Sequence, residues 1–307
     1  CYTCCPSYVN ISLGNIKEQT IEEIWNSEKA KELRKKVLSG DYSSCNLDIC
    51  SFRQNINDIS IFLEECLLPK RVFLAYDQEC NLNCIICRDE KYKNSPELID
   101  LYNEKIYKQL HGFLKNAEEI GISGSGEAFY SRHSRELIKN IASEYKNLKW
   151  NILTNGLLFT TENCKKLGIY GRIDNITISL HAINKQLYNK IMRGSNYDIV
   201  MKNIKEAVYE HQYNRSIKEI NIHSVISSIN YKEIPALAEF VCKNKINLAI
   251  VPFRYRNTEY NSDYKSVSVW EKEHPEFEEF KRILKHPALD YDKISMPPRF
   301  RKIRDME

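Results

Sequence analysis

Short apolar runs alternate with amphipathic segments along most of the chain, from residue 72 onward. Six apolar runs have the length and composition of β-strands, and they lie at 72–76, 119–124, 150–154, 176–180, 220–227 and 246–253. In the segments between them, apolar residues recur with helical spacing, which predicts helices at 95–114, 131–145, 161–167, 184–192, 197–212 and 231–243. Strands that alternate with helices in this way predict an α/β fold built from parallel βα repeats.

A βα barrel fits this alternation better than a dinucleotide-binding fold does. No Gly-x-Gly-x-x-Gly sequence follows the first predicted strand, and a dinucleotide-binding turn requires that glycine pattern. A partial or full barrel places its chemistry in the loops at the carboxyl ends of the strands. Functional residues are therefore expected directly after the predicted strands.

The first seventy residues follow a different pattern, because they are rich in turns and cysteines. Thr20 and Glu23 form a capping-box pattern, and the apolar spacing after them predicts one helix that ends near Gly40. Cys45 and Cys50 come shortly after that helix. The segment has too few apolar residues for a core of its own, so we predict a small module stabilised by a bound metal cluster.

Composition and charge argue against several classes of protein. The chain has 307 residues, of which 42% are hydrophobic and 28% charged, and its net charge of +4 is too small for a protein that coats nucleic acid. No apolar stretch is long enough to span a bilayer, and no secretory signal is visible. We therefore expect a cytoplasmic protein with no nucleic-acid or membrane partner.

The cysteine content indicates a reduced metalloprotein. The chain has eleven cysteines, and most of them fall into two groups: Cys1, Cys4, Cys5, Cys45 and Cys50, then Cys80, Cys84 and Cys87. A secreted disulfide-bonded protein of this size rarely carries such close clusters. The alternative is a set of scattered buried thiols, which suits Cys164 and Cys242 better than it suits the two groups.

Cys80, Cys84 and Cys87 form a C-x₃-C-x₂-C pattern directly after the first predicted strand. Structural zinc takes four ligands, usually as two cysteine pairs, and no fourth cysteine or histidine lies nearby in the sequence. A 4Fe–4S cluster held by three thiolates leaves one iron open for a substrate or cofactor. An iron–sulfur cluster is therefore the favoured interpretation, with zinc and a metal-free loop as alternatives.

This cysteine pattern resembles the signature of the radical S-adenosylmethionine (SAM) enzymes. The resemblance implies a partial (β/α)₆ barrel, in which the open iron binds the amino and carboxylate groups of SAM. It also implies a reaction in which an electron from the cluster cleaves SAM to a 5′-deoxyadenosyl radical, which abstracts hydrogen from a substrate. An electron donor such as flavodoxin or ferredoxin is then an expected partner.

Other segments resemble the family's SAM-binding motifs. The residues that this resemblance assigns to the cofactor are Ile86, Gly124, Ser125, Gly126, Glu127, Asn155, Ser179, Arg193 and Val225. Glu127, in SGSGEAF, is expected to accept a hydrogen bond from the SAM amino group, and Arg193 to pair with the SAM carboxylate. The alternatives are an exposed glutamate after a glycine turn and a solvated cation at a helix end. Ile86 departs from the aromatic residue common in the family, so we expect aliphatic packing against the adenine.

The N-terminal segment resembles the auxiliary-cluster region called SPASM, or its shorter twitch form. That region follows the barrel in most members, whereas here it precedes the barrel. The resemblance implies a second 4Fe–4S cluster held by Cys5, Cys45 and Cys50, with Cys4, Cys1 or an upstream residue as the fourth ligand. Zinc is the alternative. The expected domains are this module at 1–68, the barrel at 69–255 and a C-terminal extension of unassigned role at 256–307, which contains a predicted amphipathic helix at 274–287.

Two substrate classes remain open. Peptide or protein modification, by crosslinking, epimerisation or side-chain oxidation, is the first expectation, because most relatives with this module act on peptides. Oxidation or dehydration of a small molecule such as a sugar or aminocyclitol is the alternative, and a non-catalytic metal-binding scaffold is a remote one. No catalytic acid or base is assigned. His181 and His223 are weak candidates near the fourth and fifth predicted strands, where histidines more often serve packing.

Overall fold

The computed structural model describes residues 1–2, 4, 9, 11–47, 68–122, 125–254 and 263–307. Contacts divide the chain into two compact units. The first unit is made of Cys1–Lys70, Ser95–Ala117 and Pro297–Arg299, and the second of Arg71–Asn94, Glu118–Met296 and Phe300–Glu307. The second unit therefore contains the C-x₃-C-x₂-C loop and the segments predicted to contact SAM.

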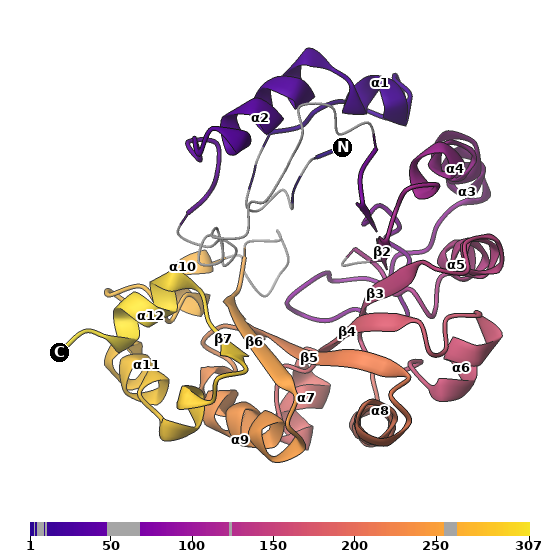
Figure 1. The fold of residues 1–307 in the computed structure, drawn as a ribbon. Helices are drawn as coiled ribbons and strands as arrows, with labels where there is room; N and C mark the ends of the chain where they lie inside the picture. The colour runs from indigo at the N-terminus through magenta and orange to yellow at the C-terminus, as the bar shows by residue number, and fades with distance from the viewer. Residues whose placement is uncertain (3, 5–8, 10, 48–67, 123–124, 255–262) are drawn as a thin grey trace. The chain divides into compact units, whose positions relative to one another are not determined.

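A parallel sheet of seven strands forms the centre of the second unit in the described part of the chain (Figure 1). The strands are β1 (Arg71–Leu74), β2 (Glu119–Ile122), β3 (Lys149–Thr154), β4 (Ile173–Ser179), β5 (Ile217–Ile226), β6 (Asn247–Pro252) and β7 (Ile294–Ser295). Neighbouring strands are consecutive in the chain and pair in parallel, with β1 and β7 at the two edges. This open sheet confirms the predicted α/β fold and is consistent with a partial barrel.

The six predicted strands are all present, and β7 is an addition that the apolar pattern does not predict. β7 has only two residues, Ile294 and Ser295, which pair with Leu248 and Ala249 of β6. So short a strand has no alternation of its own, and its place depends on the neighbour with which it pairs. The C-terminal extension, to which the sequence assigns no role, thus supplies an edge strand of the sheet.

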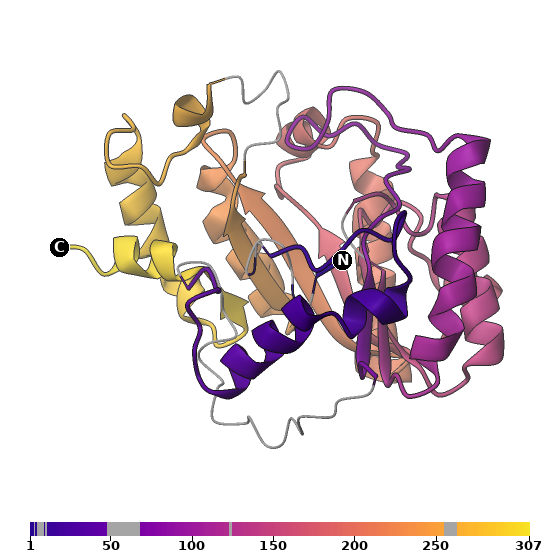
Figure 2. The ribbon, with the colours of Figure 1, turned by 90° about the horizontal axis from the view of Figure 1, so that it is seen from above.

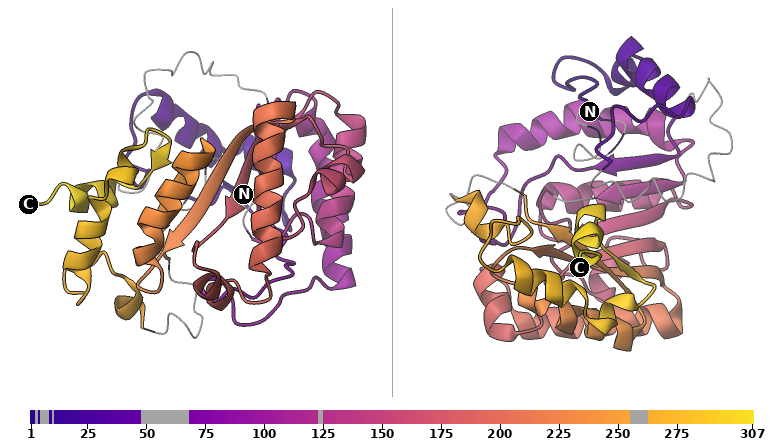
Figure 3. Two further views of the ribbon diagram at one scale, coloured as in Figure 1. Left: turned by 90° about the horizontal axis from the view of Figure 1, so that it is seen from below. Right: turned by 90° about the vertical axis from the view of Figure 1, so that its left-hand side faces the viewer.

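Helices cover one face of this sheet. They are α5 (Arg132–Glu144), α6 (Thr161–Lys166), α7 (Lys185–Ile191), α8 (Tyr197–Tyr209) with its π-helical end η3 (Glu210–Asn214), η4 (Tyr231–Glu233) and α9 (Ile234–Asn244). Figures 1 and 3 show α8 and α9 on the same side of the strands. Side-chain oxygens of Ser131, Asn184 and Asn196 cap α5, α7 and α8, which fixes where each helix begins after its loop. None of the described helices is long and apolar enough to cross a membrane.

The C-terminal segment packs beside the β6–β7 edge, in yellow in Figure 2. Its elements are α10 (Tyr264–Val267), α11 (Phe277–Leu284), η6 (Pro287–Asp290) and α12 (Pro298–Arg304), and α11 confirms the predicted amphipathic helix. Trp270, Phe280 and Phe300 are almost fully buried, and the ring of Phe300 lies 5.9 Å from that of Trp270 and 5.1 Å from that of Phe280. This aromatic cluster gives the segment a core of its own.

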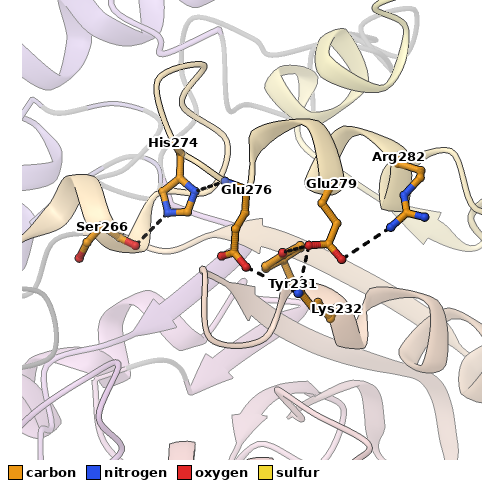
Figure 4. A network of polar contacts seen from close by, with 7 residues as sticks. All are labelled: Tyr231, Lys232, Ser266, His274, Glu276, Glu279 and Arg282. Carbon is orange, nitrogen blue, oxygen red and sulfur yellow. Dashed lines mark hydrogen bonds and ion pairs between the residues drawn. The ribbon is translucent and has the colours of Figure 1, made fainter.

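Polar contacts connect α11 to η4 (Figure 4). The Tyr231 hydroxyl donates to Glu279 Oε2 at 2.7 Å, and Lys232 Nζ lies 3.0 Å from the same oxygen. In the preceding turn, His274 Nδ1 accepts from the Glu276 backbone N–H at 3.1 Å, and the other ring nitrogen lies 3.0 Å from the Ser266 carbonyl. These bonds hold α11 beside the sheet.

The first unit has two short helices where the sequence predicts one. They are α1 (Ile21–Trp25) and α2 (Glu28–Leu38). The predicted capping box of Thr20 and Glu23 is present, but Asn26 ends α1 and Ser27 begins α2 by accepting a hydrogen bond from the Ala30 backbone N–H. Asparagine and serine offer the backbone such local alternatives to helical bonding, which explains the break.

Residues 95–117 pack with these two helices inside the first unit. They form α3 (Pro96–Tyr102), a π-helical turn η2 (Asn103–Tyr107) and α4 (Lys108–Leu114). Gln109 Oε1 accepts a hydrogen bond from the Ile21 backbone N–H at 2.8 Å, and the rings of Trp25 and Phe113 meet edge to face. A small apolar cluster of Val9, Leu13, Ile24, Ala30 and Leu33 completes the unit.

Candidate functional site

Three thiols lie on the loop that follows β1. Cys80, Cys84 and Cys87 are half-buried and form no disulfide. The backbone N–H groups of Cys87 and Arg88 both donate to the Cys84 carbonyl, and this tight turn draws the last two thiols together. Burial, with smaller contributions from the neighbouring Cys87 and Cys80, raises the pKa of the Cys84 thiol to about 12. Burial also raises the pKa of Cys80.

This donor set fits a 4Fe–4S cluster. Several half-buried thiols close enough to oppose one another's ionisation need a positively charged group between them before they become thiolates. Thiolates are the ligands that iron–sulfur clusters take, and three of them leave one iron open. In the described part of the chain, no three histidine, cysteine or carboxylate side chains are gathered to ligate a single metal ion.

The segment after α7 pairs with the cysteine loop along their backbones. Asn83 N–H donates to the Arg193 carbonyl at 3.2 Å, and Ile85 N–H donates to the Ile191 carbonyl at 3.0 Å. Arg193 Nε donates back to the Asn83 carbonyl at 3.0 Å. The terminal guanidinium nitrogens of Arg193 have no hydrogen-bond partner among the described residues, so a double donor remains available beside the loop.

Glu127 is buried between β2 and β3, with only 2% of its surface exposed. Its Oε1 accepts from the Thr154 hydroxyl at 2.7 Å and from the Phe129 N–H at 3.2 Å, while Oε2 accepts from the Asn155 N–H at 2.7 Å. Burial raises the pKa of this carboxyl, and the three hydrogen bonds oppose that rise. A carboxylate has about four acceptor positions, so one position on Oε2 remains for a donor from a ligand.

Gly126 lies directly against the cysteine loop. A Cβ atom placed on it would come within 2.5 Å of the Glu79 carbonyl oxygen and 2.8 Å of the Asp77 carbonyl oxygen. The next residue, Glu127, donates its backbone N–H to the Glu79 carbonyl at 2.9 Å. The expected approach of this glycine to SAM stays a prediction, whereas its approach to the loop backbone is observed. Gly124, predicted with it, lies outside the described residues.

Arg88 connects the cysteine loop to the segment that follows β2. The family motifs do not include this residue. Its guanidinium donates to the Gln78 carbonyl at 2.7 Å and to the Ser125 carbonyl at 2.5 Å, and it also reaches Cys87 Sγ at 3.7 Å. The Ser125 hydroxyl in turn donates to the Ala75 carbonyl at the end of β1. A cation directly after the last motif cysteine is the signal that would have identified Arg88 from the sequence.

Asp77 is a second residue that the sequence does not reveal. Its carboxylate accepts from Ser131 Oγ at 2.6 Å, Ser134 Oγ at 2.5 Å, Asn94 Nδ2 at 2.8 Å and the Glu79 N–H at 3.0 Å. Burial opposes ionisation of this group, but the hydrogen bonds outweigh it and hold the pKa of Asp77 below its usual range. Asp77 thus ties both ends of the cysteine loop to the start of α5.

The remaining predicted SAM contacts lie around this loop or at the carboxyl ends of neighbouring strands. Asn155 Nδ2 donates to Asn81 Oδ1 on the cysteine loop at 2.8 Å. Ile86 is buried within that loop. Ser179 and Val225 are half-buried near the ends of β4 and β5, which are paired in the sheet. Their contacts with SAM remain predictions, as do those of the other assigned residues.

The two candidate histidines have different environments. His181 is buried, its Nδ1 accepts from the Val225 N–H at 3.1 Å, and its carbonyl accepts from the Asn230 side chain. Burial lowers the pKa of His181 to about 3, with a smaller contribution from His223. Burial also lowers the pKa of His223 to about 4, but its ring has no hydrogen bond within the described chain. His181 thus has one ring nitrogen bonded to the backbone, whereas neither ring nitrogen of His223 has a partner among the described residues, and a catalytic role for either histidine stays a prediction.

The auxiliary-cluster cysteines are only partly within the described residues. Cys1 and Cys4 are exposed, and Cys45 is half-buried against the apolar cluster of the first unit. Cys5 and Cys50 lie outside the described residues. The ligand set of this module therefore stays a prediction.

Sequence comparison gives two family matches. Residues 78–241, more than half of the chain, match the family described as the radical SAM superfamily. Residues 1–51 match SPASM, described as an iron–sulfur cluster-binding domain. The first match contains the cysteine loop, Glu127, Asn155 and Arg193, and the second contains the N-terminal cysteine group.

Curated relatives are more distant. A probable GTP 3′,8-cyclase of Methanocaldococcus jannaschii is 28% identical over 209 residues, which cover 65% of this chain and 64% of that protein. The FeMo cofactor biosynthesis protein NifB of the same organism is 27% identical over 141 residues, or 42% of this chain and 45% of that protein. The chain thus spans less than two thirds of the length of these relatives.

A solved structure shares the fold. The structure of Streptococcus suis SuiB bound to S-adenosylmethionine superimposes with a TM-score of 0.52 and 18% sequence identity, and covers 89% of this chain and 62% of that one. At this level of identity the likeness concerns the fold alone.

Proposed function

The chain belongs to the radical SAM superfamily and carries an N-terminal SPASM-type module, and from this premise we propose that it modifies a peptide or protein by radical chemistry. Family membership makes it an enzyme that uses SAM and 4Fe–4S clusters. The observation that carries the peptide proposal is the SPASM match at residues 1–51, because most relatives with this module act on peptides.

The residues of the second unit fit the proposed cofactors. Cys80, Cys84 and Cys87 would hold the SAM-binding cluster, which when bound supplies the electron that cleaves SAM to a 5′-deoxyadenosyl radical. Arg193 would hold the SAM carboxylate with its free guanidinium nitrogens, and Glu127 would hold the amino group with the open position on Oε2. Both side chains are fixed by bonds to the protein, so little conformational freedom is lost when SAM binds.

The test of this proposal is reductive SAM cleavage by the reconstituted protein. With dithionite and SAM under anaerobic conditions, 5′-deoxyadenosine is expected as a product that increases with time, and chromatography with mass detection measures it. If no 5′-deoxyadenosine forms although the protein holds its iron, the proposed function is wrong. With candidate peptides, a mass change in the peptide would then identify the substrate class.

A small-molecule substrate is the second candidate. It is favoured by the printed names of the curated relatives, a probable GTP 3′,8-cyclase and a FeMo cofactor biosynthesis protein, neither of which is named for a peptide substrate. Hydrogen abstraction by the same radical would then oxidise, dehydrate or cyclise the small molecule. Products formed from small molecules but not from peptides would select this alternative.

Replacing Arg193 with glutamine is expected to raise the dissociation constant of SAM by about 10- to 100-fold, because a hydrogen bond to a charged group contributes about 1.5–3 kcal/mol. Titration calorimetry of SAM into the reconstituted variant measures the change. Lys190→Gln is the matched control, since Lys190 is an exposed cation in the last turn of α7, three residues before Arg193. Equal effects of both variants would show that only the general positive charge matters.

Replacing Arg88 with glutamine is expected to make the reduction potential of the SAM-binding cluster more negative. Arg88 places a positive charge and an N–H donor 3.7 Å from Cys87 Sγ, and each of these stabilises the more negative, reduced cluster. Glutamine lacks the charge, so the reduced cluster loses this stabilisation. A potentiometric titration followed by electron paramagnetic resonance measures the potential. The control is Lys93→Gln, an exposed cation of the same loop. An unchanged potential in the Arg88 variant would contradict this role.

A further inference from the structure

The two faces of the sheet differ in chemistry. One face packs against the helices, and its central residues are at most 1% exposed: Ile176, Ile178, Ile220, Ile222, Leu248 and Ile250. The other face carries polar side chains that are all half-buried: Asn175, Thr177, Asn221, His223 and Asn247. Side chains of a strand alternate between the two faces, so these polar residues point away from the helices together.

The strand register places the polar residues in one patch. Thr177 of β4 is paired with Asn221 of β5, which is paired with Asn247 of β6. Neighbouring strands lie about 4.8 Å apart, so the three side chains span roughly 10 Å. His223 follows two residues after Asn221 on the same face and is opposite Ser179, a predicted SAM contact. The patch therefore begins next to the proposed SAM position.

Hydrogen bonding within the patch is incomplete. The Thr177 hydroxyl donates to Asn175 Oδ1 at 3.0 Å, but the side chains of Asn221, His223 and Asn247 form no hydrogen bond within the described chain. Two other asparagines of this unit are satisfied. The Asn203 amide donates to two backbone carbonyls. The Asn230 amide donates to two other carbonyls and its oxygen accepts from the Ser227 N–H. The three unpaired side chains thus have donors and acceptors left for a ligand.

The three unpaired side chains of the patch are uncharged at neutral pH. Burial lowers the pKa of His223 to about 4, so the ring is neutral at neutral pH. On the same face, toward the amino ends of the strands, lie the carboxylates of Glu119 and Glu219, and Glu219 is paired in register with Asn175. Arg71 is paired with Glu119 at 3.2 Å, and Arg254, beyond the end of β6, is close enough to His223 for its positive charge to contribute to the lowered pKa of that ring. The patch thus has carboxylates toward one end and a cation toward the other, while its own three side chains carry no charge.

We propose that Asn221, Asn247 and His223 form a substrate subsite that binds an uncharged hydrogen-bonding group, a carboxamide or hydroxyl, of the molecule from which hydrogen is abstracted. The inference rests on the proposed function, because it assumes a substrate beside SAM. A peptide offers this chemistry through its amide groups, and a small polyol offers it through its hydroxyls. An apolar group would leave three polar side chains without partners, and a charged group would find no partner of opposite charge among these three side chains.

Saturation-transfer NMR on the reconstituted, SAM-bound protein tests the subsite with four probes. Propionamide and myo-inositol are the neutral polar probes, toluene is the apolar probe and propionate is the anionic probe. We expect saturation of at least one neutral polar probe and little of the other two. Stronger saturation of the amide probe would indicate that the bound group comes from a peptide substrate, and stronger saturation of the polyol would indicate a small-molecule substrate.

Substitution of Asn221 locates the binding. Asn221→Leu, which keeps the shape but not the polarity, is expected to weaken binding of the polar probe by roughly 3- to 10-fold. Asn221→Asp, which keeps the shape and adds charge, is the second variant in case leucine disturbs the sheet. Asn140→Leu, on the exposed side of α5, is the matched control and is expected to bind like the unchanged protein.

Two results would overturn the subsite. One is saturation of toluene or propionate equal to that of the polar probes, and the other is binding that neither Asn221 variant weakens more than Asn140→Leu does. SAM cleavage measured in the same unchanged sample separates the two proposals. Cleavage without selective probe binding refutes the subsite and leaves the proposed function standing, whereas absence of cleavage refutes the proposed function itself.

Discussion

A chain in which Cys80, Cys84 and Cys87 are all replaced with alanine is expected to bind about four iron atoms after anaerobic reconstitution, against about eight in the unchanged chain. The variant removes every thiol of the central loop and leaves the N-terminal cysteine group intact. Iron and labile sulfide assays measure the difference. Reductive SAM cleavage is expected to be lost in the same variant, because the open iron that binds SAM is absent.

The controls for this variant use thiols outside both groups. Cys164 is buried in α6 and Cys242 is exposed in α9, so alanine at either position removes a thiol without touching the loop. Both single variants are expected to retain about eight irons. About four irons in the unchanged chain and none in the triple variant would contradict a cluster in the N-terminal module. Equal iron in the unchanged and triple-variant chains would contradict the central one.

The sequence predicts the fold well where burial imposes a period on the chain. The strands β2 to β6 contain fully buried side chains, and the apolar runs of β1 to β6 are visible in the sequence without knowledge of any neighbour. β7 is missed because two residues carry no period, and α1 and α2 are predicted as one helix because apolar spacing continues across Asn26 and Ser27. The side chains of asparagine and serine can bond the backbone in place of helical hydrogen bonds, and only the structure shows that they do so here.

The residues of the candidate site are likewise of two kinds, those that the sequence reveals and those that only the structure reveals. The cysteine loop, Glu127 and Arg193 belong to short motifs, so spacing and resemblance find them in the sequence. Arg88 and Asp77 act through partners 37 and 57 residues away. The position of Arg88 after the last motif cysteine could have marked it as a candidate, but the sequence does not show which residues it contacts. Tertiary contacts of this kind follow from the fold, and sequence alone does not supply them.

The polar patch depends on strand register in a similar way. Thr177, Asn221 and Asn247 are spread over some seventy residues of sequence and meet only because β4, β5 and β6 pair with a particular alignment. His181 and His223 are equivalent weak candidates in the sequence. In the structure the N–H of Val225 bonds Nδ1 of His181, whereas the ring of His223 has no hydrogen-bond partner among the described residues.

Replacing Gly126 with alanine is expected to lower the thermal unfolding midpoint by several degrees and to reduce iron retention at the central loop. The new Cβ would lie 2.5 Å from the Glu79 carbonyl oxygen and 2.8 Å from that of Asp77, and these backbone atoms have no rotamer by which to move away. Overpacking of this kind costs about 1–3 kcal/mol, and each kcal/mol corresponds to roughly 2–4 °C in a protein of this size. Gly126 is not among the glycines with positive φ, so the clash accounts for the effect.

Gly112→Ala is the matched control, because it makes the same substitution at a glycine inside α4 where a Cβ meets nothing within 4 Å. Alanine is favoured over glycine in a helix interior by about 1 kcal/mol, so this variant is expected to unfold at a slightly higher temperature. Differential scanning calorimetry and iron analysis of both variants test the contrast. If Gly126→Ala keeps its iron and unfolds at the same temperature as Gly112→Ala, the loop yields to the added methyl group. Close packing of Gly126 would then not be what positions the cysteines, and the hydrogen bonds of Asp77 and Arg88 would have to position them instead.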